Sequence, residues 1–217
     1  MTRPDEAVSR LVELVAVMDR LRRECPWDRE QTHRSLARYL LEEAYETLEA
    51  IDSGDPEHLR EELGDLLLQV YFHARIGAER DPEDGGFDIE DVAGGIVDKL
   101  VHRHPHVFAG VEVADADEVD RNWEALKAAE KRRTGLLEGV PTALPALAYA
   151  DKALGRLARA GRTPELGVPA AGPVGEELLA LVVRARAEGL DAEQELRDAV
   201  RRVVGEPGEA GPGRALG

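Results

Sequence analysis

The sequence has few of the residues that would indicate a secreted or membrane-spanning protein. It contains one cysteine, Cys25, so no disulfide can form within the chain, and this favours a reducing compartment. No apolar run is long enough to cross a membrane, and the N-terminal MTRPDEAVSR is not followed by the hydrophobic segment of a signal peptide. We therefore expect a cytoplasmic protein with no membrane partner.

Aromatic residues and positive charge are also scarce. Aromatics make up 4% of the 217 residues, so leucine, valine and alanine must fill the core. The chain has 28 lysine and arginine residues against 44 aspartate and glutamate residues, which gives a net charge of −16 at pH 7. This charge argues against binding duplex nucleic acid through its phosphates. A small phosphorylated ligand stays open if a metal ion and a few cations supply positive charge.

The apolar residues that are present follow a helical spacing. They make up 43% of the chain, and no run of alternating β-branched residues indicates a strand. The sequence therefore predicts an all-α fold. We expect helices over about residues 5–23, 35–51, 56–80, 88–102 and 115–133, and a proline-interrupted connector and helix over 139–161. Three residues mark the boundaries of the second and third helices: Thr32 (or Asp28) as the cap of the second, Gly54 at its end and Pro56 opening the third.

Two of these helices carry acidic pairs three residues apart. Glu43 and Glu46 lie on the first acidic helix, expected over 35–51, and Glu62 and Asp65 lie on the second acidic helix, expected over 56–80. At about 100° per residue, one acid of each pair borders the apolar face of its helix and the other lies just outside it. The apolar faces comprise Leu40, Ala44, Leu48 and Ile51 on the first helix and Leu59, Leu63, Leu66, Leu67 and Val70 on the second. Antiparallel packing through these faces would bring all four acids to one rim.

Four carboxylates at one rim require a cation. Two like charges about 4 Å apart repel by roughly 4 kcal/mol at an effective dielectric constant of 20. Mg²⁺ is the expected ion because it is a hard cation that takes oxygen ligands, and Mn²⁺ accepts the same ligands. The outward acids Glu42, Glu49 and Glu61 are expected to be solvated.

Other motifs have simpler interpretations. Trp27, in the connector ECPWDREQT, is expected to pack on the helices rather than to support a base. His102, His104 and His106 lie around Pro105, and their alternating spacing does not match a zinc motif.

The C-terminal half contains a degraded repeat. Residues 175–186 align with 64–75 at an offset of 111, and residues 190–203 align with 87–100 at an offset of 103. The later copy lacks the functional side chains of the earlier one, because Pro173 aligns with Glu62 and Arg202 aligns with Lys99. The Gly/Pro-rich segment 205–217 is predicted to be a disordered tail.

Several motifs together resemble the MazG family of nucleoside triphosphate pyrophosphohydrolases. They are CPWDREQTH, the EExxE of Glu42, Glu43 and Glu46, the ELGD of residues 62–65, and DKLVHRHPHVF at residues 98–108. The resemblance implies a helical bundle completed by homodimerisation, with a MazG-like catalytic domain at 1–134 and a degenerate second MazG-like region at 135–204. It also implies Mg²⁺-dependent cleavage of a nucleoside triphosphate between the α- and β-phosphates, for nucleotide-pool cleansing or regulation.

The resemblance assigns roles residue by residue. The metal ligands would be Glu43, Glu46, Glu62 and Asp65. Our own hypothesis is that one of these acids or the outer Glu42 orients the attacking water. Four residues would bind the nucleotide: Lys99 and Arg103 at the phosphates, and Trp123 and Lys127 of a WxxxK element nearby. His102 departs from the family pattern, which commonly has an arginine there, so this contact would be cationic only at low pH.

Three other readings remain open. An all-α dUTP pyrophosphatase or a phosphoribosyl-ATP pyrophosphatase would share the acidic helices. A catalytically inactive helical regulator would share the fold. A carboxylate-bridged di-iron bundle requires Glu-x-x-His on two helices, and the only instance runs from Glu30 to His33.

Overall fold

The chain folds into helices joined by turns, as the spacing of its apolar residues predicts. The computed structural model describes residues 9–130, 135–162 and 174–205, and these residues contain no strand. The all-α prediction is therefore confirmed. Contacts divide the chain into unit 1, Met1–Phe108, and unit 2, Ala109–Gly217. None of the helices within the described ranges has the length and hydropathy needed to cross a membrane.

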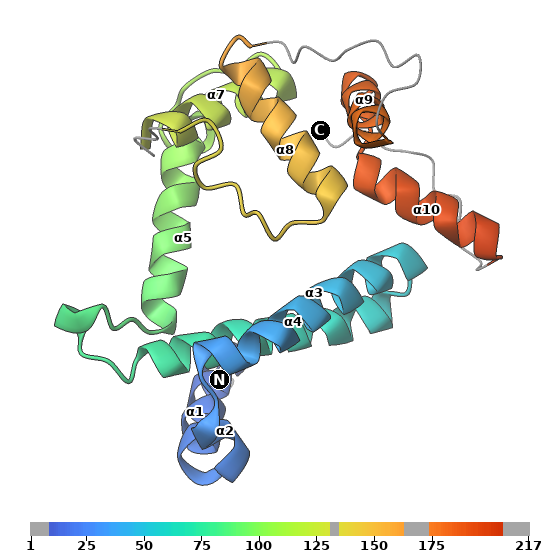
Figure 1. The fold of residues 1–217 in the computed structure, drawn as a ribbon. Helices are drawn as coiled ribbons and strands as arrows, with labels where there is room; N and C mark the ends of the chain where they lie inside the picture. Colours follow the sequence, from blue (N-terminus) through green and yellow to red (C-terminus); the bar gives the residue numbers. More distant parts are fainter. Residues whose placement is uncertain (1–8, 131–134, 163–173, 206–217) are drawn as a thin grey trace, which may run out of the picture. The chain divides into compact units, whose positions relative to one another are not determined.

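Unit 1 is built on a pair of long helices. Figure 1 shows α3 and α4 lying side by side, and the two helices contact each other along their length. The unit comprises α1 (Arg10–Glu24), α2 (Pro26–Glu30), α3 (His33–Ser53), α4 (Pro56–Gly77), the 3₁₀ turn η1 (Pro82–Asp84), α5 (Ile89–Arg103) and α6 (Pro105–Phe108). Both α1 and α5 contact α4.

Capping residues fix where α3 and α4 begin and end. The Thr32 side chain accepts from the backbone N–H of Ser35, and the Ser35 side chain accepts from the Thr32 N–H, which forms a capping box. Gly54 ends α3 at a φ of 69°, in the left-handed region that favours glycine. Asp55 caps α4, and Pro56 occupies its first position. The predicted roles of Thr32, Gly54 and Pro56 are confirmed.

The core of unit 1 gathers where the start of α3 meets the end of α4. Its buried members are Met18, Leu36, Tyr71, Phe72 and Ile76. Trp27 packs on this region by its edges, with ring centroids 5.9 Å from Tyr39 and 6.3 Å from Phe72, and 49% of it is exposed. This contact agrees with the expected packing role of Trp27.

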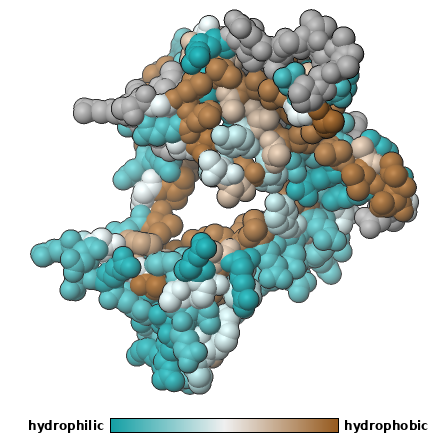
Figure 2. Space-filling model, in the orientation of Figure 1, coloured by the Kyte–Doolittle hydropathy of each residue, from teal (hydrophilic) through white to brown (hydrophobic). Residues whose placement is uncertain are grey.

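The apolar faces predicted to join α3 and α4 are buried only in part: Ala44, Leu59, Leu66 and Leu67 are half-buried, and the other members are exposed. Leu48 is 42% exposed, Ile51 55% and Leu63 49%. The buried residues of α3 are Leu36, Thr47 and Ala50, and Glu43 reaches Gln69 of α4. Toward the turn at Gly54, the small and polar residues Thr47 and Ala50 are therefore buried, while large apolar residues such as Leu48 and Ile51 are exposed. Figure 2 shows hydrophobic surface over the α3–α4 pair and along α5.

Unit 2 is a second group of helices. It comprises α7 (Ala116–Glu130), α8 (Ala146–Arg159), α9 (Val174–Ala187) and α10 (Ala192–Val204), and the last three contact one another. Leu154 of α8 and Val182 of α9 are buried. Helix α9 contains the segment 175–186, and α10 contains all but the first two residues of the segment 190–203, the two segments predicted to be repeats. The domain boundaries at 134 and 204 stay predictions, and the predicted tail lies outside the described residues from 206 onward.

Candidate metal centre

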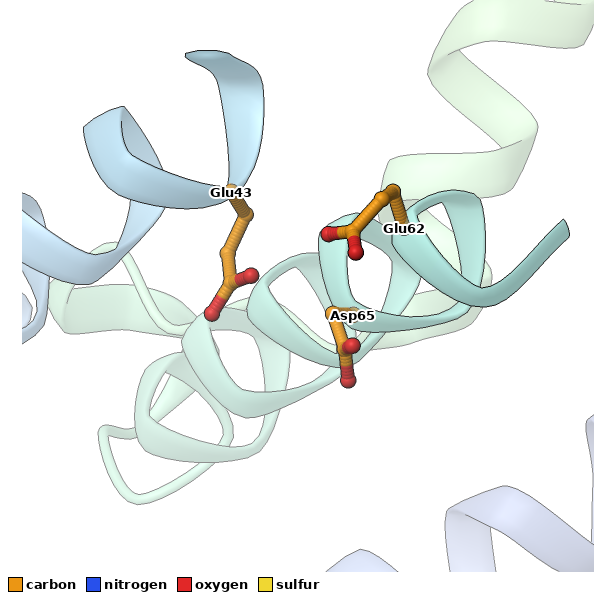
Figure 3. Close-up of side chains that lie close together, drawn as sticks. All are labelled: Glu43, Glu62 and Asp65. Atoms are coloured by element: carbon orange, nitrogen blue, oxygen red, sulfur yellow. The ribbon is translucent and has the colours of Figure 1, made fainter. Parts of the chain in front are cut away.

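Three acidic side chains from α3 and α4 converge in unit 1. Glu43, Glu62 and Asp65 are each half-buried, and each offers a carboxylate oxygen within 4.8 Å of the others. Figure 3 shows Glu43 on one helix facing Glu62 and Asp65 on the other. We call these three residues the acidic cluster. Its composition agrees with three of the four predicted metal ligands.

The local sequence explains why these residues meet. Glu62 and Asp65 are three positions apart, so they lie on the same side of α4. Glu43 and Asp65 are equally far along the chain from Gly54, where α3 ends. In an antiparallel helical hairpin, residues equally distant from the turn lie opposite each other.

Glu46, the fourth predicted ligand, is exposed but close enough to act on the cluster. The pKa of Glu43 is raised above its ordinary value chiefly by burial, and then by the negative charges of Asp65, Glu46 and Glu62. A hydrogen bond with Glu46 raises it further. Each of these causes disfavours the charged form of Glu43. A bound cation would offset the neighbouring negative charges and so favour the charged form.

Two neighbours of the acidic cluster were not predicted from the sequence. Gln69 is 5% exposed, and its Nε2 donates to Glu43 Oε1 at 3.5 Å while its own Oε1 is buried without a hydrogen-bond partner. His58 Nε2 lies 3.3 Å from Glu62 Oε1. Their spacing in the sequence could have indicated these contacts. His58 precedes Glu62 by four residues and Gln69 follows Asp65 by four, so each lies one helical turn from an acid of the cluster.

The donor set suits a hard divalent cation. The cluster offers only carboxylate oxygens, the ligands preferred by Mg²⁺ and Mn²⁺. Over the parts of the chain that the structure describes, no lysine or arginine forms an ion pair with Glu43, Glu46, Glu62 or Asp65. The lysines and arginines of these described parts therefore leave the four acids unneutralised. Among the same residues, the group of potential metal ligands is formed by the acids and does not include the histidines at 102, 104 and 106.

The remaining predicted site residues lie outside the acidic cluster, on α3, α5 and α7. Glu42 is exposed on α3, outside the acidic cluster. Lys99 is exposed and Arg103 is 5% exposed, one turn apart on α5. Trp123 and Lys127 are half-buried on α7 in unit 2. The structure thus brings together three of the four predicted metal ligands, Glu43, Glu62 and Asp65, and the roles of all the predicted site residues stay predictions.

Comparisons with known proteins agree on one family. Residues 31–108 match the MazG nucleotide pyrophosphohydrolase domain. This segment contains the acidic cluster, Glu46, Lys99 and Arg103. The nucleoside triphosphate pyrophosphohydrolase of Escherichia coli K12 is 40% identical over 200 residues, which cover 88% of this chain and 74% of the relative.

Two further relatives match over most of this chain. An uncharacterised protein of Streptomyces cacaoi is 48% identical over 208 residues, covering 91% of this chain and 84% of the relative. The nucleoside triphosphate pyrophosphohydrolase of Mycobacterium tuberculosis is 47% identical over 191 residues, covering 88% of this chain and 55% of the relative. The chain thus spans about half the length of this mycobacterial relative.

Proposed function

The chain belongs to the MazG family of nucleoside triphosphate pyrophosphohydrolases, and we propose that it cleaves a nucleoside triphosphate between the α- and β-phosphates. The products would be a nucleoside monophosphate and pyrophosphate, and the role would be nucleotide-pool cleansing or regulation. The observation that carries the proposal is the acidic cluster, because three carboxylates within 4.8 Å of one another suit a metal ion and not a free phosphate.

The metal site would consist of the acidic cluster and Glu46, with Mg²⁺ as the natural ion and Mn²⁺ as a substitute. When bound there, the ion would neutralise phosphate charge and lower the pKa of a water molecule. Gln69 and His58 would hold Glu43 and Glu62 in place through the contacts at 3.5 Å and 3.3 Å. Such supporting contacts fix the direction in which a carboxylate presents its oxygens.

Water and phosphates would be handled by separate residues. Glu42, beside the acidic cluster, and Glu43 and Glu62, within it, are the proposed residues for orienting the attacking water. Lys99 and Arg103 lie one turn apart on α5 and would hold the triphosphate and stabilise the charge that develops on the leaving pyrophosphate. Trp123 and Lys127 would contact the nucleotide.

A second copy of the chain would complete the bundle. Large apolar side chains are exposed on two helices: Leu40, Leu41, Tyr45, Leu48 and Ile51 on α3, and Val92, Ile96, Val97, Leu100 and Val101 on α5. Burial of apolar surface yields about 25 cal/mol per Å², so these faces favour association. We propose a homodimer in which these helices are covered.

Product analysis tests the reaction. Purified protein with Mg²⁺ and a panel of ribo- and deoxyribonucleoside triphosphates should yield monophosphate and pyrophosphate. Glu62→Gln should abolish this turnover, while Glu61→Gln, an exposed neighbour on α4, should retain it. Diphosphate and phosphate as products would refute the cleavage position. Full turnover by Glu62→Gln at limiting Mg²⁺ would refute the metal site, and a folded but inactive protein would favour the regulator.

A further inference from the structure

Two histidines meet where the start of α3 lies against the end of α4. His33 is the first residue of α3, and His73 lies four residues before the end of α4. Their Nδ1 atoms are 2.8 Å apart. Neither residue belongs to the acidic cluster, which lies nearer the turn at Gly54. We call His33 and His73 the histidine pair.

The geometry identifies the contact within the histidine pair as a hydrogen bond between ring edges. The two ring planes are parallel to within 1°, and the ring centroids are 5.1 Å apart. Rings that stack face to face lie about 3.5 Å apart or more. The Nδ1 atoms are closer than that and much closer than the ring centres, so they lie between the two centres. The rings therefore meet edge to edge, through Nδ1.

This contact requires one hydrogen between the two rings. In a neutral histidine, one ring nitrogen is a donor and the other is an acceptor, and in a charged histidine both are donors. One Nδ1 of the pair therefore donates to the other. The bond survives one added proton, because a charged ring still donates to a neutral one. It is lost when both rings are charged, since two N–H groups would then face each other at 2.8 Å.

The second nitrogen of His73 offers no alternative place for a proton. Its Nε2 is buried, and within the described part of the chain it has no hydrogen-bond partner. A buried N–H without a partner is destabilising, and so is a buried charge. Burial and then the charge of His33 lower the pKa of His73 from its ordinary value of 6.5. Charging His73 is therefore coupled to opening of the histidine pair.

The histidine pair also supports the loop before α5, through Phe87. The Phe87 ring lies against His33, with centroids 6.3 Å apart and planes at 16°. Its backbone N–H donates to Gly77 O at 3.4 Å, and a Cβ at Gly77 would be only 2.7 Å from Phe87 O. The lack of a side chain at Gly77 thus allows the loop to lie close to the end of α4. Phe87 directly precedes Asp88, which caps α5.

The charged groups in this region are paired and keep their charges while histidines titrate. They are Asp19 and Arg22 of α1, Asp28 of α2, Arg75 and Glu79 of α4, and Asp88 before α5. Glu79 is the one that acts on the histidine pair, and it lies 2.7 Å from Arg22 and 3.2 Å from Arg75. Its pKa is lowered chiefly by the hydrogen bond with Arg22 and least by His33. A change between pH 7.5 and 5.0 therefore falls on the histidines.

We propose that the histidine pair is an acid-sensitive latch that fixes the loop before α5 to the α3–α4 hairpin. With one shared hydrogen the latch is closed and His33 supports Phe87. When both rings are charged the latch opens and the start of α5 loosens, while Ile89 still packs on the core. An effect on catalysis rests on the proposed function. Lys99 and Arg103 lie on α5, so an open latch would weaken their hold on the triphosphate in acid.

Hydrogen exchange of the backbone amides of residues 86–95 in the full chain tests the latch. It is followed by mass spectrometry at pH 7.5 and 5.0, and proteins are compared at the same pH because the intrinsic rate changes with pH. In His33→Asn the amide oxygen can accept from His73 Nδ1 whether or not His73 is charged. His33→Leu cannot form the bond at either pH. Both variants lose the ring contact with Phe87, so their comparison isolates the hydrogen bond.

The expected results differ between the two pH values. At pH 7.5 the wild type and His33→Asn should exchange alike, and His33→Leu should exchange about five- to tenfold faster because it lacks one hydrogen bond. At pH 5.0 the wild type should exchange as fast as His33→Leu, while His33→Asn stays about five- to tenfold slower. His106→Asn, which removes a histidine from α6, should follow the wild type throughout.

Two results would overturn the proposal: equal exchange in the wild type and His33→Leu at pH 7.5, or equal exchange in the wild type and His33→Asn at pH 5.0. If circular dichroism shows that His33→Leu is misfolded, the second comparison decides alone. Glu62→Gln separates this proposal from the proposed function. It should lose turnover and show wild-type exchange at both pH values, because Glu62 belongs to the acidic cluster and not to the latch.

Discussion

Replacing Glu43 by glutamine should stabilise the metal-free protein and destabilise the metal-bound one. The carboxylate oxygens of Glu43, Glu62 and Asp65 lie within 4.8 Å of one another, so each pair of charges repels by about 3.5 kcal/mol or more at an effective dielectric constant of 20. All three residues are half-buried, and solvent screening and side-chain relaxation reduce this figure considerably. We expect Glu43→Gln to gain about 1–2 kcal/mol in EDTA. The glutamine keeps an oxygen that can accept from Gln69 Nε2.

Mg²⁺ should reverse the order of stability. At a free concentration 100 times its Kd, a ligand that binds only the folded state adds about 2.7 kcal/mol. If removal of one carboxylate weakens the affinity by about 100-fold, the same concentration adds only about 0.4 kcal/mol to the variant. The wild type should therefore be the less stable protein in EDTA and the more stable one in Mg²⁺.

Thermal unfolding followed by Trp27 fluorescence measures both states. Trp27 packs on the core of unit 1, and a Trp123→Phe background common to all samples removes the only other tryptophan. For a chain of this size, 1 kcal/mol corresponds to about 2–4 °C in Tm. Glu49→Gln is the matched control, since it removes a carboxylate from an exposed position of α3. A Glu43→Gln protein less stable than wild type in EDTA, or equally stabilised by Mg²⁺, would refute the reasoning.

Three further predictions concern neighbouring features. Gln69→Leu should weaken Mg²⁺ binding by about tenfold in a titration followed by Tm, because Glu43 loses its buried donor; unchanged affinity would contradict this. The pKa of His73 is lowered from 6.5 by burial and by His33, so its contribution to stability is present above pH 6.5 and lost as the pH falls below it. Denaturant unfolding from pH 7.5 to 5.5 should therefore show a smaller loss of stability in His73→Phe, and parallel curves would argue against the role. Leu48→Asp should give a helical monomer in sedimentation, because a charge on the proposed interface opposes association; a dimer of wild-type strength would exclude this face.

Local signals in the sequence predicted the boundaries of the acidic helices well. Thr32, Gly54 and Pro56 were each identified from residue type alone, because capping and turn formation depend on one side chain and its nearest backbone. The convergence of Glu43 with Glu62 and Asp65 followed from the hairpin, since a tight turn at Gly54 fixes which residues face each other.

The side of each helix that makes the contact was not predictable in the same way. Helical periodicity identified an apolar face on α3, but it could not say whether α4 or another chain covers that face. In the structure Leu48 and Ile51 are exposed while Thr47 and Ala50 are buried. The contact of Gln69 with Glu43 was missed for the same reason, because a lone polar residue on a helix gives no indication of its partner.

The positions of the core and of the acidic cluster explain how unit 1 can tolerate repulsion between its acids. The core residues Leu36, Phe72 and Ile76 lie at the start of α3 and the end of α4, far along both helices from the turn at Gly54. The acidic cluster lies between that core and the turn, where the buried residues Thr47, Ala50 and Gln69 contribute little apolar area. Apolar burial at one end therefore holds the helices together against the repulsion between the acids in their middle. A cation at the acidic cluster would then act on a preformed pair of helices, so that its binding energy is not spent on folding them.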